Sequence, residues 1–155
     1  MASKVPIVRQ IAWLSVLVQT LLIISLSFLY RFIFPESYFL LAIATFLVIF
    51  FLLRTLVPAQ HRKGVRLFKQ KKFEEAIPCF RASYEFFSKR RWIDKYRFIT
   101  LLSSSRISYL EMALLNEAFC ISQLERKAEA IEKYENVLKE FPDSEMAISA
   151  LKLLK

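Results

Sequence analysis

The sequence predicts an all-α protein, with an N-terminal transmembrane helical hairpin followed by a small α-helical domain. Two long apolar runs occupy the first third of the chain, and a single glycine, Gly64, occurs in 155 residues. Residues 59–155 divide into helical segments, with breaks near Lys71, Ser88–Arg91, Ser103–Ser105, Arg126 and Phe141–Asp143. One glycine cannot supply the tight turns of a β-sheet or a glycine-rich phosphate loop, so both classes are disfavoured.

The two apolar runs are Ile11–Tyr30, with twenty uncharged residues, and Tyr38–Val57, with sixteen residues before Arg54. A helix needs roughly 20 mostly apolar residues to cross a bilayer. The remaining 98 residues are too few to bury two such helices inside a soluble core. A cleaved signal peptide is disfavoured because the first run ends in YRFIFPES, without a small-residue cleavage site. We predict a membrane anchor over residues 1–57, with transmembrane helices at about 11–30 and 38–57 and a turn at 31–37.

Positive charge gathers after the second run, whereas the turn holds only Arg31 and Glu36. The positive-inside rule therefore places the end of the second helix in the cytoplasm. Two crossings return Lys4 and Arg9 to the same side. The sequence predicts an integral membrane protein with two spans and both termini cytoplasmic, and we favour a bacterial inner membrane. The predicted membrane-surface basic patch consists of Arg54, Arg62, Lys63, Arg66, Lys69, Lys71 and Lys72.

The charge of the remaining chain is uneven. Residues 58–106 hold thirteen Lys and Arg against four Asp and Glu, whereas residues 107–155 hold six against nine. Because the basic half adjoins the bilayer, anionic membrane lipids are its expected partners. Nucleic acid is a less favoured alternative, based on the interleaved cations and aromatics of Ser88–Phe98 (SKRRWIDKYRF). An acidic protein partner is a further alternative.

The domain over residues 58–155 contains a repeated pattern. Gly64 precedes Ala76 by twelve residues, and Phe80 follows four residues later. Ala118, Ala130 and Tyr134 repeat this spacing 54 residues further along the chain. Small residues let two antiparallel helices approach closely, while the aromatic residue fills the groove beside them. This pattern is typical of helix pairs that stack on copies of themselves.

At these residues the chain resembles a tetratricopeptide repeat (TPR) protein, through Gly64, Leu67, Phe73, Ala76, Phe80, Ala118, Ile121, Ala130, Tyr134 and Pro142. The resemblance implies TPR-like helix pairs at about 60–88 and 106–142, an extra helix at about 91–104 and a capping helix at about 144–154. The offset of 54 residues exceeds the 34 of a regular array. Lys127 stands where an aromatic residue is usual, and Pro78 interrupts one helix.

TPR stacks bind a peptide or helix on the concave face lined by the first helix of each pair. The resemblance therefore implies a protein or peptide partner and six candidate partner-binding residues. For Phe119 the alternative is packing in the core. The six residues are Arg62, Val65, Lys69, Asn116, Phe119 and Gln123.

No pattern points to an enzyme, a cofactor or a metal site. His61, the one histidine, is expected to be exposed and lies far from Ser103–Ser105, so a catalytic triad is disfavoured. Cys79 and Cys120 are expected to be reduced thiols that serve as small hydrophobic residues. Glutamates of the last third, including the pair Glu129–Lys133, are expected to form surface ion pairs.

We therefore predict a membrane-tethered, non-catalytic adaptor or scaffold for protein–protein interaction. The alternative is an accessory subunit of a larger membrane complex, or an oligomer, that associates through the hairpin. Ala42 and Ala44 are the small residues available for that contact. A transporter is less favoured, and Gln19 is the polar residue that would carry such a role.

Overall fold

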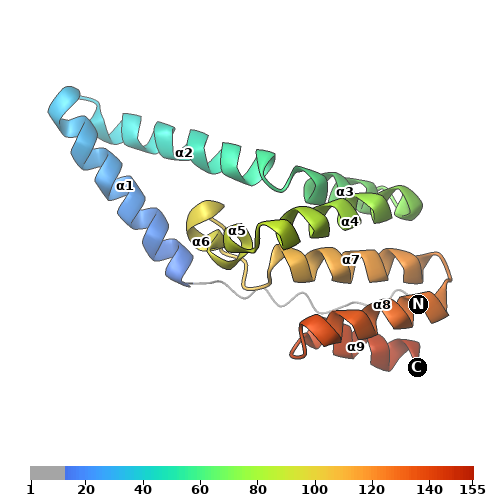
Figure 1. Ribbon diagram of the computed structural model, residues 1–155. Coiled ribbons are helices and arrows are strands. Elements are labelled where there is room, and N and C mark those ends of the chain that lie inside the picture. The colour runs from blue at the N-terminus through green and yellow to red at the C-terminus, as the bar shows by residue number, and fades with distance from the viewer. Residues whose placement is uncertain (1–12) are drawn as a thin grey trace. The chain divides into compact units, whose positions relative to one another are not determined.

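The computed structural model describes residues 13–155, and over this range it contains α-helices and no β-strand (Figure 1). The prediction of an all-helical chain is confirmed for these residues. The chain divides into two compact units. The first comprises the described residues up to Arg54 together with Tyr96–Arg106. The second comprises Thr55–Lys95 and Ile107–Lys155.

The first unit contains α1 (Trp13–Ile33) and α2 (Tyr38–Leu56) as far as Arg54, and both helices are long and apolar enough to cross a membrane. The phenol of Tyr30 and the hydroxyl of Thr45 lie 3.0 Å apart and join the two helices by a hydrogen bond. Helix α1 continues three residues beyond its predicted end at residue 30. The predicted start at residue 11, and the cations Lys4 and Arg9, lie outside the described residues.

The first unit also contains α6 (Arg97–Thr100), which packs on α1. The Gln19 amide of α1 donates hydrogen bonds to Ser15 Oγ at 3.0 Å and to the carbonyl oxygen of Leu102 at 2.8 Å. Arg97 closes the loop after α6 by donating to the carbonyl oxygens of Ser105, at 3.0 Å, and of Arg106. A backbone segment 83 residues away is therefore fixed to the first transmembrane candidate.

The single extra helix predicted at about 91–104, within a continuous second domain, is not what the structure shows. The segment forms α5 (Arg91–Lys95) in the second unit and α6 in the first. The break follows from Asp94, which is buried and accepts the backbone N–H groups of Tyr109 at 2.8 Å and Leu110 at 3.0 Å. Such N–H groups at a helix start have no partner within the helix. Asp94 thus holds α5 at the start of α7.

The second unit begins with an antiparallel pair, α3 (Ala59–Lys69) and α4 (Phe73–Lys89). A Cβ atom at Gly64 would lie 2.8 Å from the buried ring of Phe80, so this close approach requires glycine. After α3, Lys71 adopts the left-handed conformation (φ 59°). The N–H groups of Lys71 and Lys72 return to the carbonyls of Phe68 and Leu67, which is the Schellman ending of a helix.

The second pair consists of α7 (Tyr109–Gln123) and α8 (Lys127–Glu140). Its turn contains Glu125 in the left-handed conformation (φ 60°), 54 residues after Lys71. Ala118 and Ala130 are fully buried, and Tyr134 is almost fully buried. The sequence offset between the pairs is therefore repeated in the backbone of the two turns.

The two pairs stack with like helices parallel. Helices α3 and α7 run in the same direction, because His61 meets Tyr109 near their starts and Phe68 meets Phe119 near their ends, both at ring distances of 5.3 Å. Helices α4 and α8 are also parallel. Glu74 meets Arg126 at 3.8 Å near their starts, and the Tyr84 phenol donates to Glu140 at 2.8 Å near their ends.

Helix α4 packs against both α3 and α7, and α9 (Glu145–Leu154) packs against α8 (Figure 1). Two apolar clusters fill this second unit. The first joins α3, α4, α7 and α8 around Phe80 and Ile121, and the second joins α7, α8 and α9 around Val137 and Leu151. Ser144 is the N-cap residue of α9, but its buried hydroxyl has no hydrogen-bond partner.

Candidate protein-binding face

Helices α3 and α7 form the candidate protein-binding face, and all six predicted residues lie on them. Three are exposed: Arg62 and Lys69 on α3 and Gln123 on α7. Val65, Asn116 and Phe119 are half-buried. On each helix the residues follow a spacing of three and four, which aligns them in one stripe.

The apolar members of this face also contribute to the core. Val65 packs against the first apolar cluster, and the ring of Phe119 lies 5.3 Å from that of Phe68. Phe119 therefore packs partly in the core, as its alternative interpretation expected. The residues with polar side chains remain as the part of the stripe that a partner can contact: Arg62, Lys69, Asn116 and Gln123.

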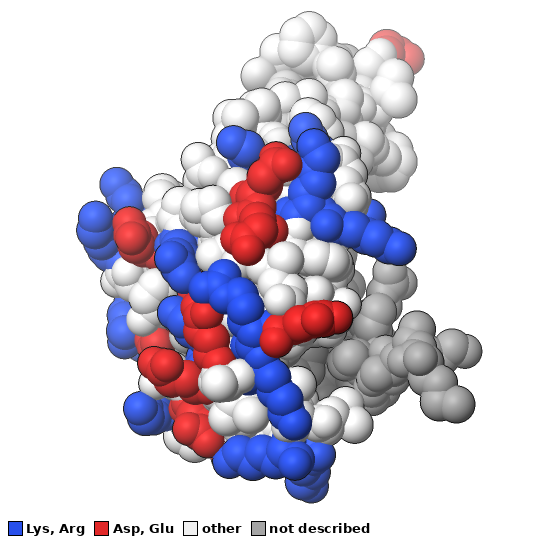
Figure 2. All heavy atoms as spheres, turned by 90° about the vertical axis from the view of Figure 1, so that its right-hand side faces the viewer, with Lys and Arg blue, Asp and Glu red and all other residues white. Residues whose placement is uncertain are grey.

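The predicted basic patch divides between the two units. Arg54 belongs to the first unit, where its guanidinium lies 5.0 Å from the centre of the Phe50 ring. The other six cations are exposed on α3 and in the turn after it. Lys72 also forms an ion pair with Glu75 at 3.6 Å. On the face shown in Figure 2, Lys and Arg side chains are interspersed with Asp and Glu.

His61 is buried, with 6% of its surface exposed, so the expectation of an exposed histidine is wrong. Its Nδ1 lies 3.3 Å from the hydroxyl of Ser83, and its ring packs edge-on against Phe80 and Tyr109. Burial lowers the pKa of His61 from its usual 6.5 to about 4. His61 is therefore a neutral part of the core at pH 7.

A buried ionic cluster connects three helices of the second unit. Glu117 of α7 has a side chain only 5% exposed, and its Oε1 accepts Nε of Arg81 at 2.8 Å and Nζ of Lys133 at 3.0 Å. Lys133 thus pairs with Glu117 rather than with the predicted Glu129, which pairs with Arg126 at 2.6 Å. No periodicity in the sequence identifies such a pairing, because its partners lie on different helices.

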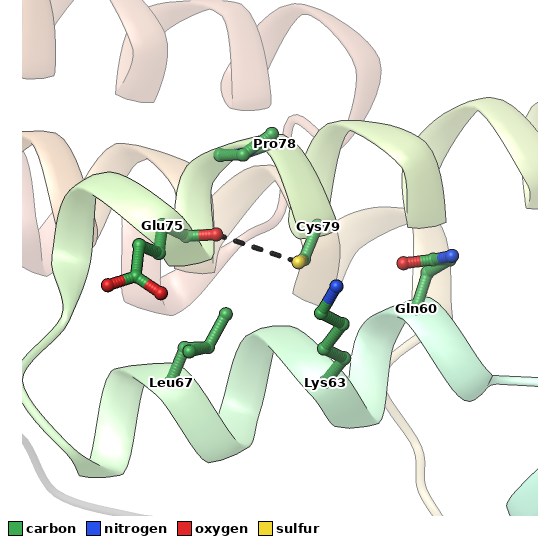
Figure 3. Close-up of a pocket in the computed structure, with 6 residues that line it drawn as sticks. All are labelled: Gln60, Lys63, Leu67, Glu75, Pro78 and Cys79. Atoms are coloured by element: carbon green, nitrogen blue, oxygen red, sulfur yellow. Dashed lines mark hydrogen bonds between the residues drawn. The ribbon is translucent and has the colours of Figure 1, made fainter.

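An open groove of about 420 Å³ lies between α3 and α4 (Figure 3). Its lining includes Lys63 and Leu67 of α3, facing Glu75 and Cys79 of α4. The Cys79 thiol donates to the carbonyl oxygen of Glu75 at 3.6 Å. None of the lining residues belongs to the predicted stripe; they are Gln60, Lys63, Leu67, Glu75, Pro78 and Cys79.

Two buried groups of the second unit, Cys120 and Tyr134, have raised pKa values. Both cysteines are buried and free, as expected for thiols used in packing. Burial, assisted by the nearby Glu117, raises the pKa of Cys120 to about 12. Burial likewise raises the pKa of Tyr134 to about 12. Among residues 13–155, no group of three or more His, Cys, Asp or Glu is placed to hold a metal ion.

The chain matches no protein-family model, and no curated protein or solved structure shows significant similarity to it.

Proposed function

We propose that this chain is a membrane-tethered, TPR-like adaptor that binds a protein or peptide partner along α3 and α7. The observation that carries the proposal is the parallel alignment of these two helices, held by the ring contacts His61–Tyr109 and Phe68–Phe119. Stacked helix pairs with parallel first helices present an extended surface made of two adjacent stripes. No catalytic step is part of this function.

The stripe carries cations and amides. It therefore favours a partner that offers acidic groups and groups able to form hydrogen bonds with an amide. Arg62 and Lys69 are seven residues apart on α3, which separates them by about two helical turns. Asn116 and Gln123 have the same spacing on α7. A peptide or helix lying along the stripe would meet two cations on α3 and two amides on α7. Amide groups can both donate and accept hydrogen bonds, which suits recognition of a peptide backbone.

The hairpin would hold this domain at a membrane surface. We propose that α1 and α2 span the bilayer with both termini in the cytoplasm, in a bacterial inner membrane. The length and apolar composition of both helices support a span. The cations that follow Leu56 support the cytoplasmic orientation and contact with anionic lipids. Tethering would raise the effective concentration of a weak binder for partners at the same membrane.

A second candidate is an accessory subunit that associates with a membrane complex through the hairpin. The observation that favours it is the exposed Ala44 on α2, a small residue that would allow another helix to approach closely. Ala42 does not serve this purpose, because it is fully buried. Substitution of Ala44 alone is therefore the informative test of this candidate.

A crosslinked pull-down from native membranes tests the adaptor. The variant Arg62→Glu/Lys69→Glu/Asn116→Ala changes the stripe, and the matched control Lys127→Glu/Lys139→Glu/Asn136→Ala makes the same charge change around α8. We expect the stripe variant to lose specific partners and the α8 control to retain them, with both equally helical by circular dichroism.

The alternatives give different results in the same experiment. Partners that survive both triple changes but are lost in Ala44→Leu would assign association to the hairpin. Partners retained by the stripe variant and by Ala44→Leu would refute both candidates, because neither surface would then carry the interaction.

A further inference from the structure

The segment Lys89–Ile99, called here the rim segment, combines exposed aromatic and apolar side chains with exposed cations. Trp92 is 60% exposed, Tyr96 46% and Ile99 53%. Its exposed basic residues are Lys89, Arg90, Arg91 and Lys95. Tryptophan and tyrosine are the residues enriched at the boundary between lipid headgroups and acyl chains.

The end of the rim segment belongs to the same compact unit as the hairpin. Helix α6 packs on α1, and the Gln19 amide donates to the carbonyl oxygen of Leu102 at 2.8 Å. Leu101, Leu102 and Ser103 are almost fully buried. Gln19 lies six residues into the described part of α1, about 9 Å along its axis from Trp13. The loop after α6 is thereby held beside the first third of a helix that can span a membrane.

Polar backbone at such a depth requires an internal partner, because the hydrocarbon core offers no water. Gln19 and Arg97 supply these partners for the carbonyls of Leu102, Ser105 and Arg106. Gln19 thus serves as a hydrogen-bond donor to the backbone of the neighbouring loop. Trp92 precedes Tyr96 by four residues, so the chain keeps it within about 14 Å of the part of the rim segment that belongs to the first unit.

The single acid of the rim segment does not oppose an anionic surface. Both carboxylate oxygens of Asp94 accept backbone N–H groups at the start of α7, and the residue is buried. Trp92 lies two positions earlier on α5, about 200° around the helix, and therefore faces the opposite side. Arg91 shares its charge with Glu140 at 3.1 Å, and Lys89, Arg90 and Lys95 are exposed cations of the same segment.

We infer that the rim segment is a third membrane contact, in which Trp92, Tyr96 and Ile99 enter the interface of an anionic bilayer while Lys89 and Arg90 contact its phosphate headgroups. This inference rests on the proposed membrane insertion of the hairpin. It assigns a lipid-binding role to residues outside the basic patch that follows the second helix. An aromatic group flanked by cations suits this occupant, because apolar insertion and charge attraction then act together.

Tryptophan fluorescence of the full chain in vesicles tests the inference, since Trp13 and Trp92 are its two tryptophans. The variant Trp13→Phe reports on Trp92, and Trp92→Phe reports on Trp13. Each is reconstituted in phosphatidylcholine vesicles with or without phosphatidylglycerol, containing lipids that carry a quencher either near the headgroup or deep in the acyl chain. We expect headgroup-level quenching of Trp92 that is stronger in the anionic vesicles and is accompanied by a blue-shifted emission.

The charge contribution is tested in the Trp13→Phe chain. Lys89→Glu/Arg90→Glu is expected to abolish the dependence of Trp92 quenching on phosphatidylglycerol. The control Lys127→Glu/Lys152→Glu, with the same change in net charge, is expected to leave it intact. Equal effects of the two variants would overturn the assignment of the headgroup contact to Lys89 and Arg90.

The two proposals fail in distinguishable ways. If lipid quenches Trp13 but Trp92 responds only to a water-soluble quencher, the hairpin is inserted and the rim inference is wrong. If lipid quenches neither tryptophan, the membrane insertion itself is wrong. Protection of Trp92 by added single-stranded nucleic acid, without quenching by lipid, would overturn the inference in favour of nucleic-acid binding.

Discussion

The two helix pairs of the second unit have the same left-handed conformation at one residue of their turns but bury different polar groups. Lys71 and Glu125 adopt the same left-handed conformation at equivalent positions, 54 residues apart. His61 and Ser83 of the first pair correspond, at the same offset, to Leu115 and Val137 of the second, all four buried. The second pair buries Glu117 instead. The two pairs thus agree in the conformation of these turn residues, while the polar residues that they bury differ.

Among the substitutions considered, a change at Gly64 is expected to have the largest effect on the free energy of unfolding. Gly64→Ala would place a Cβ atom 2.8 Å from the Phe80 ring, which is fully buried and has little room to move. We expect a loss of about 1–3 kcal/mol in the free energy of unfolding, even though alanine favours the helix by about 1 kcal/mol. Thermal unfolding of the full chain in detergent, followed by circular dichroism, measures the effect.

Two further variants make this comparison specific. Adding Phe80→Leu should relieve the clash, so the double variant should lose less than the sum of the two single changes. Ala118→Gly, at the equivalent position of the second pair, should cost about 1 kcal/mol through helix propensity alone. A stability of Gly64→Ala equal to that of the parent chain would show that the two helices can separate without cost.

The second largest effect is a loss of stability in acid, which we expect to come from His61 in the first pair. The pKa of His61 is about 4 in the folded chain and near 6.5 when unfolded, so below pH 6.5 the unfolded chain takes up a proton first. Stability is then lost as the pH falls from about 6.5 towards 4, by roughly 2 kcal/mol between pH 7 and pH 5. Above pH 7 this group has no further effect.

The variant His61→Leu/Ser83→Val copies the second pair and isolates this contribution. Its stability should fall less than that of the parent chain between pH 7 and pH 5, as measured by thermal unfolding at each pH. Equal losses in the two chains would mean that His61 becomes protonated without leaving its folded position. Changing both residues together avoids leaving the Ser83 hydroxyl unpaired in the core.

The sequence predicted the positions that control close approach but not the environment of His61. The spacing of Gly64, Ala76 and Phe80 identified the contact between α3 and α4 directly. His61 was expected to be exposed because cations surround it in the sequence, although Leu115 at the equivalent position indicates a core site. Alignment of the two pairs at their offset of 54 residues would have detected this.

The segment after α4 could not be predicted from local pattern for a different reason. Residues 91–104 have the composition of one helix, yet Asp94 binds the start of α7 and Leu102 binds Gln19. Both contacts join residues distant in sequence, so no window along the chain contains both partners. The same limit applies to Glu117, whose two cationic partners lie on α4 and α8.

The ionic cluster of the second pair should make a smaller contribution than its burial suggests. Glu117→Gln keeps the shape of the side chain but removes its charge, and we expect a loss of about 1–2 kcal/mol. Arg81 is half exposed and can return to water, which limits the cost. Thermal unfolding compared with Glu135→Gln, an exposed glutamate paired with Lys155, provides the control. An equal effect at both positions would show that burial does not strengthen the cluster.

The smallest expected change in stability comes from the left-handed turn residues, which both pairs contain. Lys71 and Glu125 adopt a conformation that costs a non-glycine residue roughly 1 kcal/mol, and glycine is the usual residue at this point of a helix ending. Lys71→Gly and Glu125→Gly should therefore each raise the free energy of unfolding by up to about 1 kcal/mol, since the greater freedom of glycine in the unfolded chain offsets part of the gain. Chemical unfolding of both variants beside Lys72→Gly, a residue outside the left-handed region, measures the difference. Equal gains at both turns would show that the pairs share this energetic feature as well as their geometry. A gain at one turn only would mean that the other side chain makes a compensating contact, and the two turns would then be equivalent in backbone alone.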